Sequence, residues 1–136
     1  MKKLFLFLVI HTVMFANMNY ELKLYEKVLV SIFKKQKLNV YVSNNIRVLL
    51  KNSDKFNIVN ICDKSVDLLI GDKFIGLAYE CKNKPLFSTS HKSFKNDKNS
   101  FGAFYWRKGR PQIIFNQDVL DNYKLVLPDS LKRYVK

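Results

Sequence analysis

Polar side chains gather at two places where chemistry could occur, each directly after a short apolar run. The first follows residues 38–42, and the second follows Leu86 and Phe87. Ligands of open α/β sheets bind at the carboxyl ends of strands, so these groups would favour a carboxylate or phosphate-like anion if the two strands were neighbours. The alternative is that they are ordinary caps and turns, where Ser, Thr and Asn are common. The predicted ligand-binding residues are Ser43, Asn44, Asn45, Ser88, Thr89, Ser90, His91 and Lys92.

Residues 104–110 have the composition of a surface that recognises a protein partner. This segment holds the single Trp of the chain and two of its four Arg residues. An aromatic ring beside arginines is typical of interface hot spots, and Arg side chains can grip a carboxylate. The alternative is a solvated hairpin tip with the Trp106 ring in the core. The predicted partner-binding residues are Tyr105, Trp106, Arg107, Lys108 and Arg110.

Catalytic patterns are weak by comparison. His91 is too close in sequence to Ser88 and Ser90 to argue for a nucleophile, base and orienting acid. The chain has no G-x-S-x-G, P-loop or dinucleotide motif, and its eleven Asp and Glu residues are scattered. His91 is also the only histidine after residue 16, which argues against a zinc site. We therefore predict a protein that is not an enzyme, with no catalytic residues, no metal and no cofactor.

Two cysteines, Cys62 and Cys81, are present in the whole chain. If the domain is exported, as the N-terminal residues discussed below predict, the two thiols most often pair, because the compartments outside the cytoplasm are oxidising. We therefore predict a disulfide between them. The alternative is two buried free thiols.

The elements that would position these residues alternate between helical and strand patterns. Apolar residues at helical spacing over residues 20–35 predict a first helix. Short β-branched and aromatic runs predict strands at residues 38–42, 56–61, 66–70 and 84–87, and a hairpin with arms at residues 103–106 and 111–115. Further helices are expected after Ser43, after Ser90, after Asn116 and after Asp129, while residues 73–82 are ambiguous between a short strand and a turn. The order predicts a single α/β domain whose mixed, mostly parallel sheet has flanking helices and a C-terminal β-hairpin.

The N-terminus predicts export by a cleavable signal peptide. Lys2 and Lys3 precede an apolar stretch over residues 4–15, and Ala16 is a small residue of the kind that signal peptidase needs. The stretch is shorter than the roughly 20 residues that span a bilayer. We expect residues 1–16 to be the signal peptide and residues 17–136 to be the exported domain in the periplasm. The alternatives are an uncleaved anchor and a buried first helix.

The chain is strongly basic, with a formal net charge of +13. Removal of Lys2 and Lys3 lowers this charge to +11 (13 − 2). Such a charge favours acidic partners and is compatible with peripheral contact with an anionic membrane surface. Most of the cations are lysines, which are poorly suited to bidentate recognition. We therefore expect no nucleic-acid partner.

The stretch from Gly102 to Tyr134 resembles the C-terminal part of the YfiR-like family of small periplasmic proteins. The matching features are Gly102, the two apolar strands joined by a basic turn at residues 107–110, Asn116 before a short helix, and a final Leu-rich helix. The resemblance implies a periplasmic α/β domain that binds the outer domain of a membrane signalling protein and restrains it. In the best-known members of the family that target makes cyclic di-GMP inside the cell.

Three functions follow as hypotheses. The first is a periplasmic regulatory module that docks on a membrane-bound sensor or signalling protein through the hairpin at residues 104–110. The second is a small solute-binding domain that holds an anionic ligand in the loops after Val42 and Phe87. The third, and the weakest, is a hydrolase that uses His91.

Overall fold

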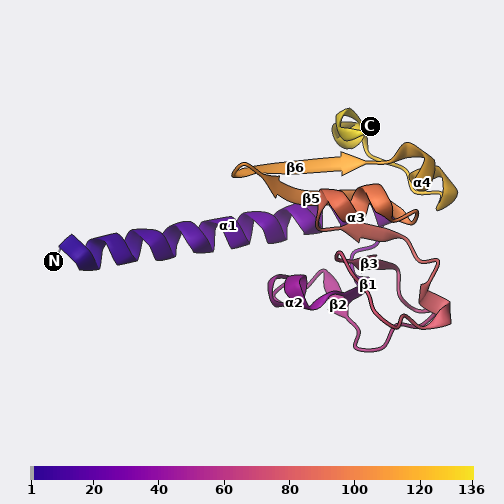
Figure 1. Ribbon diagram of the computed structural model, residues 1–136, viewed down its shortest axis with the longest axis horizontal. Helices are drawn as coiled ribbons and strands as arrows, with labels where there is room; N and C mark the ends of the chain where they lie inside the picture. The colour runs from indigo at the N-terminus through magenta and orange to yellow at the C-terminus, as the bar shows by residue number, and fades with distance from the viewer. Residues whose placement is uncertain (1) are drawn as a thin grey trace.

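The computed structural model describes the backbone of residues 2–136 and the side chains of residues 18–136. Its elements, in chain order, are α1 (Lys2–Phe33), β1 (Leu38–Val42), α2 (Asn44–Leu50), β2 (Phe56–Ile58), β3 (Leu68–Ile70), the 3-10 helix η1 (Tyr79–Cys81), β4 (Leu86–Ser88), α3 (His91–Asn96), β5 (Ser100–Arg107), β6 (Arg110–Phe115), α4 (Gln117–Asn122) and the 3-10 helix η2 (Asp129–Tyr134). Figure 1 shows these elements gathered around one sheet, with the N-terminal half of α1 extending beyond it.

Six strands form one sheet in the order β2-β1-β3-β4-β5-β6. The first five are mutually parallel, and β6 pairs antiparallel with β5 at one edge. The predicted fold class, a mixed and mostly parallel sheet with flanking helices and a C-terminal hairpin, is confirmed. The carboxyl ends of the five parallel strands lie on the same side of the sheet. The loops after β1, β3 and β4 and the hairpin turn after β5 are therefore all on that side.

Helices α1 and α2 cover one face of the sheet. The helical spacing in α1 places Tyr25, Val28, Leu29 and Ile32 in the core, where they pack with side chains from β1, β3, β4 and β5. Residues from α4 and η2 complete the same cluster. In Figure 1, α3 lies in front of β5 and α1 passes behind it, so the sheet lies between two layers.

The other face is covered in part by irregular chain instead of a helix. The loops before β3 and before β4 place Cys62, Val66 and Cys81 against Leu69 and Leu86 in a second, smaller core. A disulfide joins Cys62 to Cys81 with their Cα atoms 6.0 Å apart, which confirms the predicted pairing. The bond fixes the two loops to each other, and such a bond is compatible with a protein exported to an oxidising compartment.

Several element boundaries differ from those predicted. Strand β2 ends at Ile58 and not at Ile61, whose side chain is exposed beyond the last pair with β1. The ambiguous residues 73–82 contain no strand, only η1. Two residues, Lys108 and Gly109, form the hairpin turn, because Arg107 and Arg110 already pair as the last rung of the ladder. Both turn residues have positive φ, of 51° and 74°, as a two-residue turn of this kind requires.

Two predicted helix starts have different outcomes. The Asn116 side chain accepts a hydrogen bond from the Val119 N–H at 3.3 Å, so Asn116 caps α4 as predicted. Pro128, and not Asp129, is the cap residue of the last element, which is a 3-10 helix. The Asp129 carboxylate pairs instead with the Lys132 ammonium at 2.7 Å, and this pairing lowers the pKa of Asp129.

Helix α1 is longer than the predicted helix over residues 20–35, since it runs from Lys2 to Phe33. The predicted signal peptide, residues 1–16, lies outside the residues whose side chains the structure describes. Within the described part of the chain, no helix combines the length and apolar character needed to cross a membrane.

Candidate functional site

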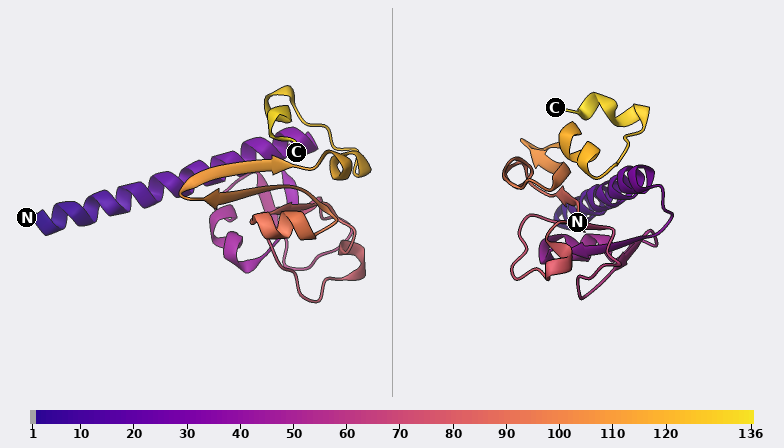
Figure 2. Two further views of the ribbon diagram at one scale, coloured as in Figure 1. Left: turned by 45° about the horizontal axis from the view of Figure 1, so that its top comes forward. Right: turned by 90° about the vertical axis from the view of Figure 1, so that its right-hand side faces the viewer.

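The hairpin β5–β6 projects past the ends of the neighbouring strands. Strand β4 pairs with β5 only as far as Ala103, so the four residues from Phe104 to Arg107 are paired with β6 alone. Figure 2 shows the hairpin running alongside α1. At its tip, Arg107, Lys108 and Arg110 are all exposed. The predicted partner-binding residues therefore lie on the part of the hairpin that extends beyond β4, where all of them except the half-buried Tyr105 are exposed.

Trp106 is held between this part of the hairpin and α1. Its indole N–H donates a hydrogen bond to the Glu21 carboxylate, and its ring meets the Phe104 ring edge-on at 5.9 Å. The side chain nevertheless keeps 41% of its surface exposed, so the alternative of a Trp106 ring in the core is wrong. An aromatic ring that is both exposed and fixed loses little conformational freedom on binding, which suits it to an interface.

The condition on which the predicted anion site depended is not met. Strands β1 and β4 are not neighbours, because β3 lies between them. The loop after β3 fills the intervening space: a Cβ on Gly71 would come within 2.1 Å of the Ser43 Oγ. Gly71 also has a φ of +147°, which other residues rarely adopt. Ser43 and its neighbours Asn44 and Asn45 are thus separated from the loop after β4 by the backbone at Gly71.

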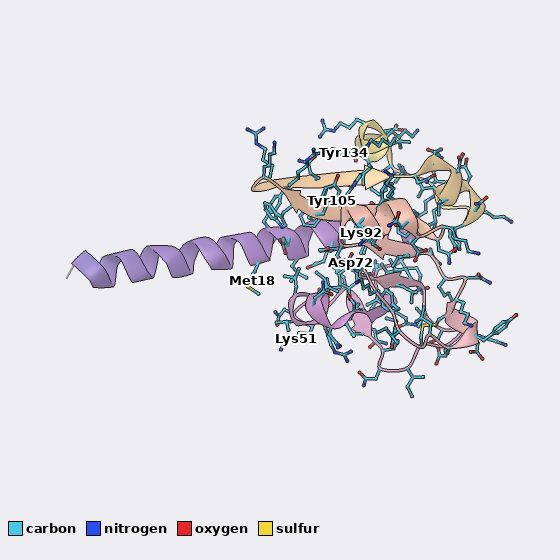
Figure 3. All side chains as sticks on the ribbon, in the orientation of Figure 1. Met18, Lys51, Asp72, Lys92, Tyr105 and Tyr134 are labelled. Carbon is cyan, nitrogen blue, oxygen red and sulfur yellow. A yellow bond between two sulfur atoms is a disulfide. The ribbon has the colours of Figure 1, made fainter. Side chains whose placement is uncertain are left out.

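Asp72, which the sequence analysis did not single out, holds the loop after β4 in place. Its Oδ1 accepts hydrogen bonds from the Thr89 N–H at 3.0 Å and from the Thr89 hydroxyl at 2.8 Å. Its backbone carbonyl accepts a further bond from the Ser93 hydroxyl at 3.3 Å. Figure 3 shows Asp72 near Lys92 on this side of the molecule. The Thr89 N–H and hydroxyl are thus engaged with Asp72, so they are not free to bind the predicted anion.

Two of the predicted ligand-binding serines have internal roles. Ser88 is fully buried, and its hydroxyl bonds with the Ser100 hydroxyl at 2.7 Å and the Ser93 hydroxyl at 3.1 Å. The Ser90 hydroxyl accepts from the Ser93 N–H at 3.1 Å and so caps α3. The alternative, an ordinary cap, therefore describes Ser90, whereas Ser88 is the last residue of β4. His91 and Lys92 remain exposed.

The two predicted sites meet in one depression. A hollow of about 460 Å³ lies between the loop after β4 and the hairpin, and residues from both sites line it. Two of its lining side chains, His91 and Tyr105, have ring centroids 5.5 Å apart. The lining residues are Thr89, Ser90, His91, Tyr105, Trp106 and Arg107. His91 and the hairpin therefore form a single surface, which we call the hairpin site.

Beneath the hairpin site, Tyr25 links α1 to the strands. Its ring meets Phe87 at 5.8 Å and Phe104 at 5.5 Å, both edge-on. Burial raises the pKa of the Tyr25 hydroxyl far above its usual value, and the negative charges of Glu21 and Asp72 raise it further. Tyr25 consequently stays protonated across the physiological pH range and acts as a packing residue.

Among the described residues, no group of three or more His, Cys, Asp or Glu side chains could hold a metal ion. No protein-family model matches the chain, and a comparison with curated proteins finds no match.

Proposed function

We propose that the protein is a periplasmic binding module that docks, through the hairpin site, on the outer domain of a membrane-bound signalling protein and regulates it. One observation carries the proposal: Trp106 is fixed by Glu21 yet exposed, on an arm whose tip presents Arg107, Lys108 and Arg110 to solvent. Aromatic and arginine side chains are enriched at interface hot spots. The resemblance of residues 102–134 to YfiR-like proteins points to the same kind of partner.

The charge of the hairpin tip defines the chemistry of the partner. None of the three cations at the tip takes part in a salt bridge within the described part of the chain. They are therefore available to acidic groups on a partner surface. Charge complementarity of this kind mainly raises the rate of association, so we expect association to slow as salt concentration rises.

Replacing Trp106 by Ala should weaken docking by roughly 30-fold, which corresponds to about 2 kcal/mol, the threshold of an interface hot spot. The measurement is affinity capture from envelope extracts followed by mass spectrometry, and then titration of the purified partner domain against both forms. Tyr79→Ala is the matched control, because Tyr79 is an aromatic residue that is 84% exposed and lies in η1, far along the chain from the hairpin. If a membrane protein is retained equally by Trp106→Ala and the wild type, the proposal fails.

A second candidate function is solute binding in the same place. The hollow of about 460 Å³ has the size of a small-molecule pocket and contains the exposed His91 and Arg107 side chains. An anionic ligand held there would lose affinity on Arg107→Ala, while Trp106→Ala would leave membrane-protein capture intact. The two proposals thus predict opposite outcomes for capture by the Trp106 variant.

A further inference from the structure

A groove on the other side of the hairpin is bordered by three elements: α1, the outer edge of β6, and η2. We call it the basic groove, and its volume is about 340 Å³. Its floor is apolar and includes Leu24, Ile113 and Leu131. Its rim carries Lys23 and Lys27 from successive turns of α1 and Arg133 from η2, and none of the lining residues is acidic. Trp106 does not line it, so this surface is separate from the hairpin site.

One border of the basic groove, the outer edge of β6, has backbone hydrogen-bonding groups that point away from β5. Residues of an antiparallel strand point their N–H and C=O alternately toward and away from the neighbouring strand. The Asn116 N–H donates to the Phe101 carbonyl at 2.9 Å, which directs residue 116 toward β5. The register is regular from Phe115 back to Arg110, so Phe115 and Ile113 both direct their backbone groups outward. Pro111 has no N–H to offer, and the open part of the edge is therefore centred on Ile113.

The chain itself already adds a strand to this edge. The Lys136 N–H donates to the Phe115 carbonyl at 3.0 Å, and Val135 pairs parallel with Phe115. The preceding residues, 129–134, form a 3-10 helix and leave the edge, so they do not continue the pairing back to Ile113. The basic groove is the space that they leave.

We propose that the basic groove binds an extended acidic peptide segment of a protein partner by strand addition at Ile113. The outward N–H and C=O of Ile113 would pair with the peptide backbone, and alternate apolar side chains would enter the floor. Lys23, Lys27 and Arg133 would pair with carboxylates on the rim. A second copy of this chain is disfavoured, because its own positive charge (+13 for the full sequence, +11 after removal of Lys2 and Lys3) would be repelled by the same cations. A lipid would leave the backbone groups of Ile113 without partners.

The test uses a fluorescent, end-capped peptide of about eight residues that alternates Glu and Val, a length sufficient to cross the groove as a strand. We expect the full chain to bind it and the double variant Lys23→Glu/Lys27→Glu to bind at least about tenfold more weakly in fluorescence anisotropy titrations. The matched control is Lys51→Glu/Lys95→Glu, which changes the net charge equally at exposed positions on α3 and at the end of α2. Amide exchange at Ile113, followed by NMR, should slow when the peptide is bound.

Several outcomes would overturn this proposal. They are no peptide binding, an equal loss in the control variant, and unchanged exchange at the Ile113 amide. Binding to phosphatidylglycerol vesicles that the Lys23→Glu/Lys27→Glu variant abolishes, with no peptide binding, would assign the groove to lipid instead. Trp106→Ala should leave peptide binding unchanged, so failure here can be told from failure of the hairpin site.

Discussion

Replacing Phe87 by Ala is expected to lower the free energy of unfolding by about 4 kcal/mol, within the range of roughly 3–5 kcal/mol for a buried Phe. Phe87 is completely buried at the centre of the sheet. The centroid of its ring lies 5.8 Å from that of Tyr25, 5.6 Å from that of Phe101 and 6.5 Å from that of Phe115. One side chain thus joins α1 to both strands of the hairpin, and no single neighbour can fill the cavity that its removal leaves.

The measurement for Phe87→Ala is urea unfolding followed by far-UV circular dichroism and by Trp106 fluorescence. Since domains of this size are stable by about 5–15 kcal/mol, the variant should remain folded only at low urea concentration. Ile75→Ala is the control, because Ile75 is 98% exposed and its truncation should change stability by no more than about 0.5 kcal/mol. A loss below about 2 kcal/mol for Phe87→Ala would contradict the central position assigned to this ring.

Local sequence patterns were sufficient to predict most elements of the fold. The residues of β3, from Leu68 to Ile70, are all buried, which is why a continuous apolar run marked the strand. The spacing of Tyr25, Leu29 and Ile32 marked the buried face of α1 for a similar reason. These patterns reflect which side chains of an element are buried, and so they locate the elements along the chain.

The same patterns contain no information on which strands are neighbours. Strand β1 pairs with both β2 and β3, and β3 therefore separates β1 from β4. The predicted anion site required β1 and β4 to be neighbours. In the structure, Gly71 and Asp72 of the loop after β3 lie between the two groups of predicted residues. Asp72 itself was missed because Gly-Asp after a strand looks like an ordinary stop. Its partner, Thr89, lies 17 residues away in the sequence.

Exposure was the other property that the sequence left open. The hydroxyls of Ser88 and Ser90 looked equivalent, yet Ser88 is completely buried in a network with Ser100 while Ser90 caps a helix. Trp106 was compatible with both a core and a surface position, and its 41% exposure in the structure decides between them. The basic groove could not be anticipated because it forms between α1 and two elements near the C-terminus, β6 and η2.

Removing the disulfide is expected to lower the free energy of unfolding by about 3 kcal/mol in the chain-entropy model, for a loop of roughly 20 residues. Cys62 and Cys81 are both buried, so the variant Cys62→Ala/Cys81→Ala is preferable to serines, which would bury hydroxyl groups. The second core, which these loops help to form, contains five buried residues, and two of them are the cysteines themselves. Amide exchange should therefore rise first in residues 59–66 and 71–82 and remain slow in β4 and β5.

Urea unfolding of the double variant, beside the wild type with and without a reducing agent, measures this effect. The reduced wild type and the double variant should agree within about 1 kcal/mol, because both lack the same constraint on the unfolded chain. Ile61→Ala serves as the control, since Ile61 is adjacent to Cys62 in the sequence but is exposed and does not take part in the disulfide. Thiol titration of the unreduced protein should find no free sulfhydryl. An unchanged free energy of unfolding after reduction would contradict this prediction. It would show that packing in the second core is enough to order the two loops without the disulfide.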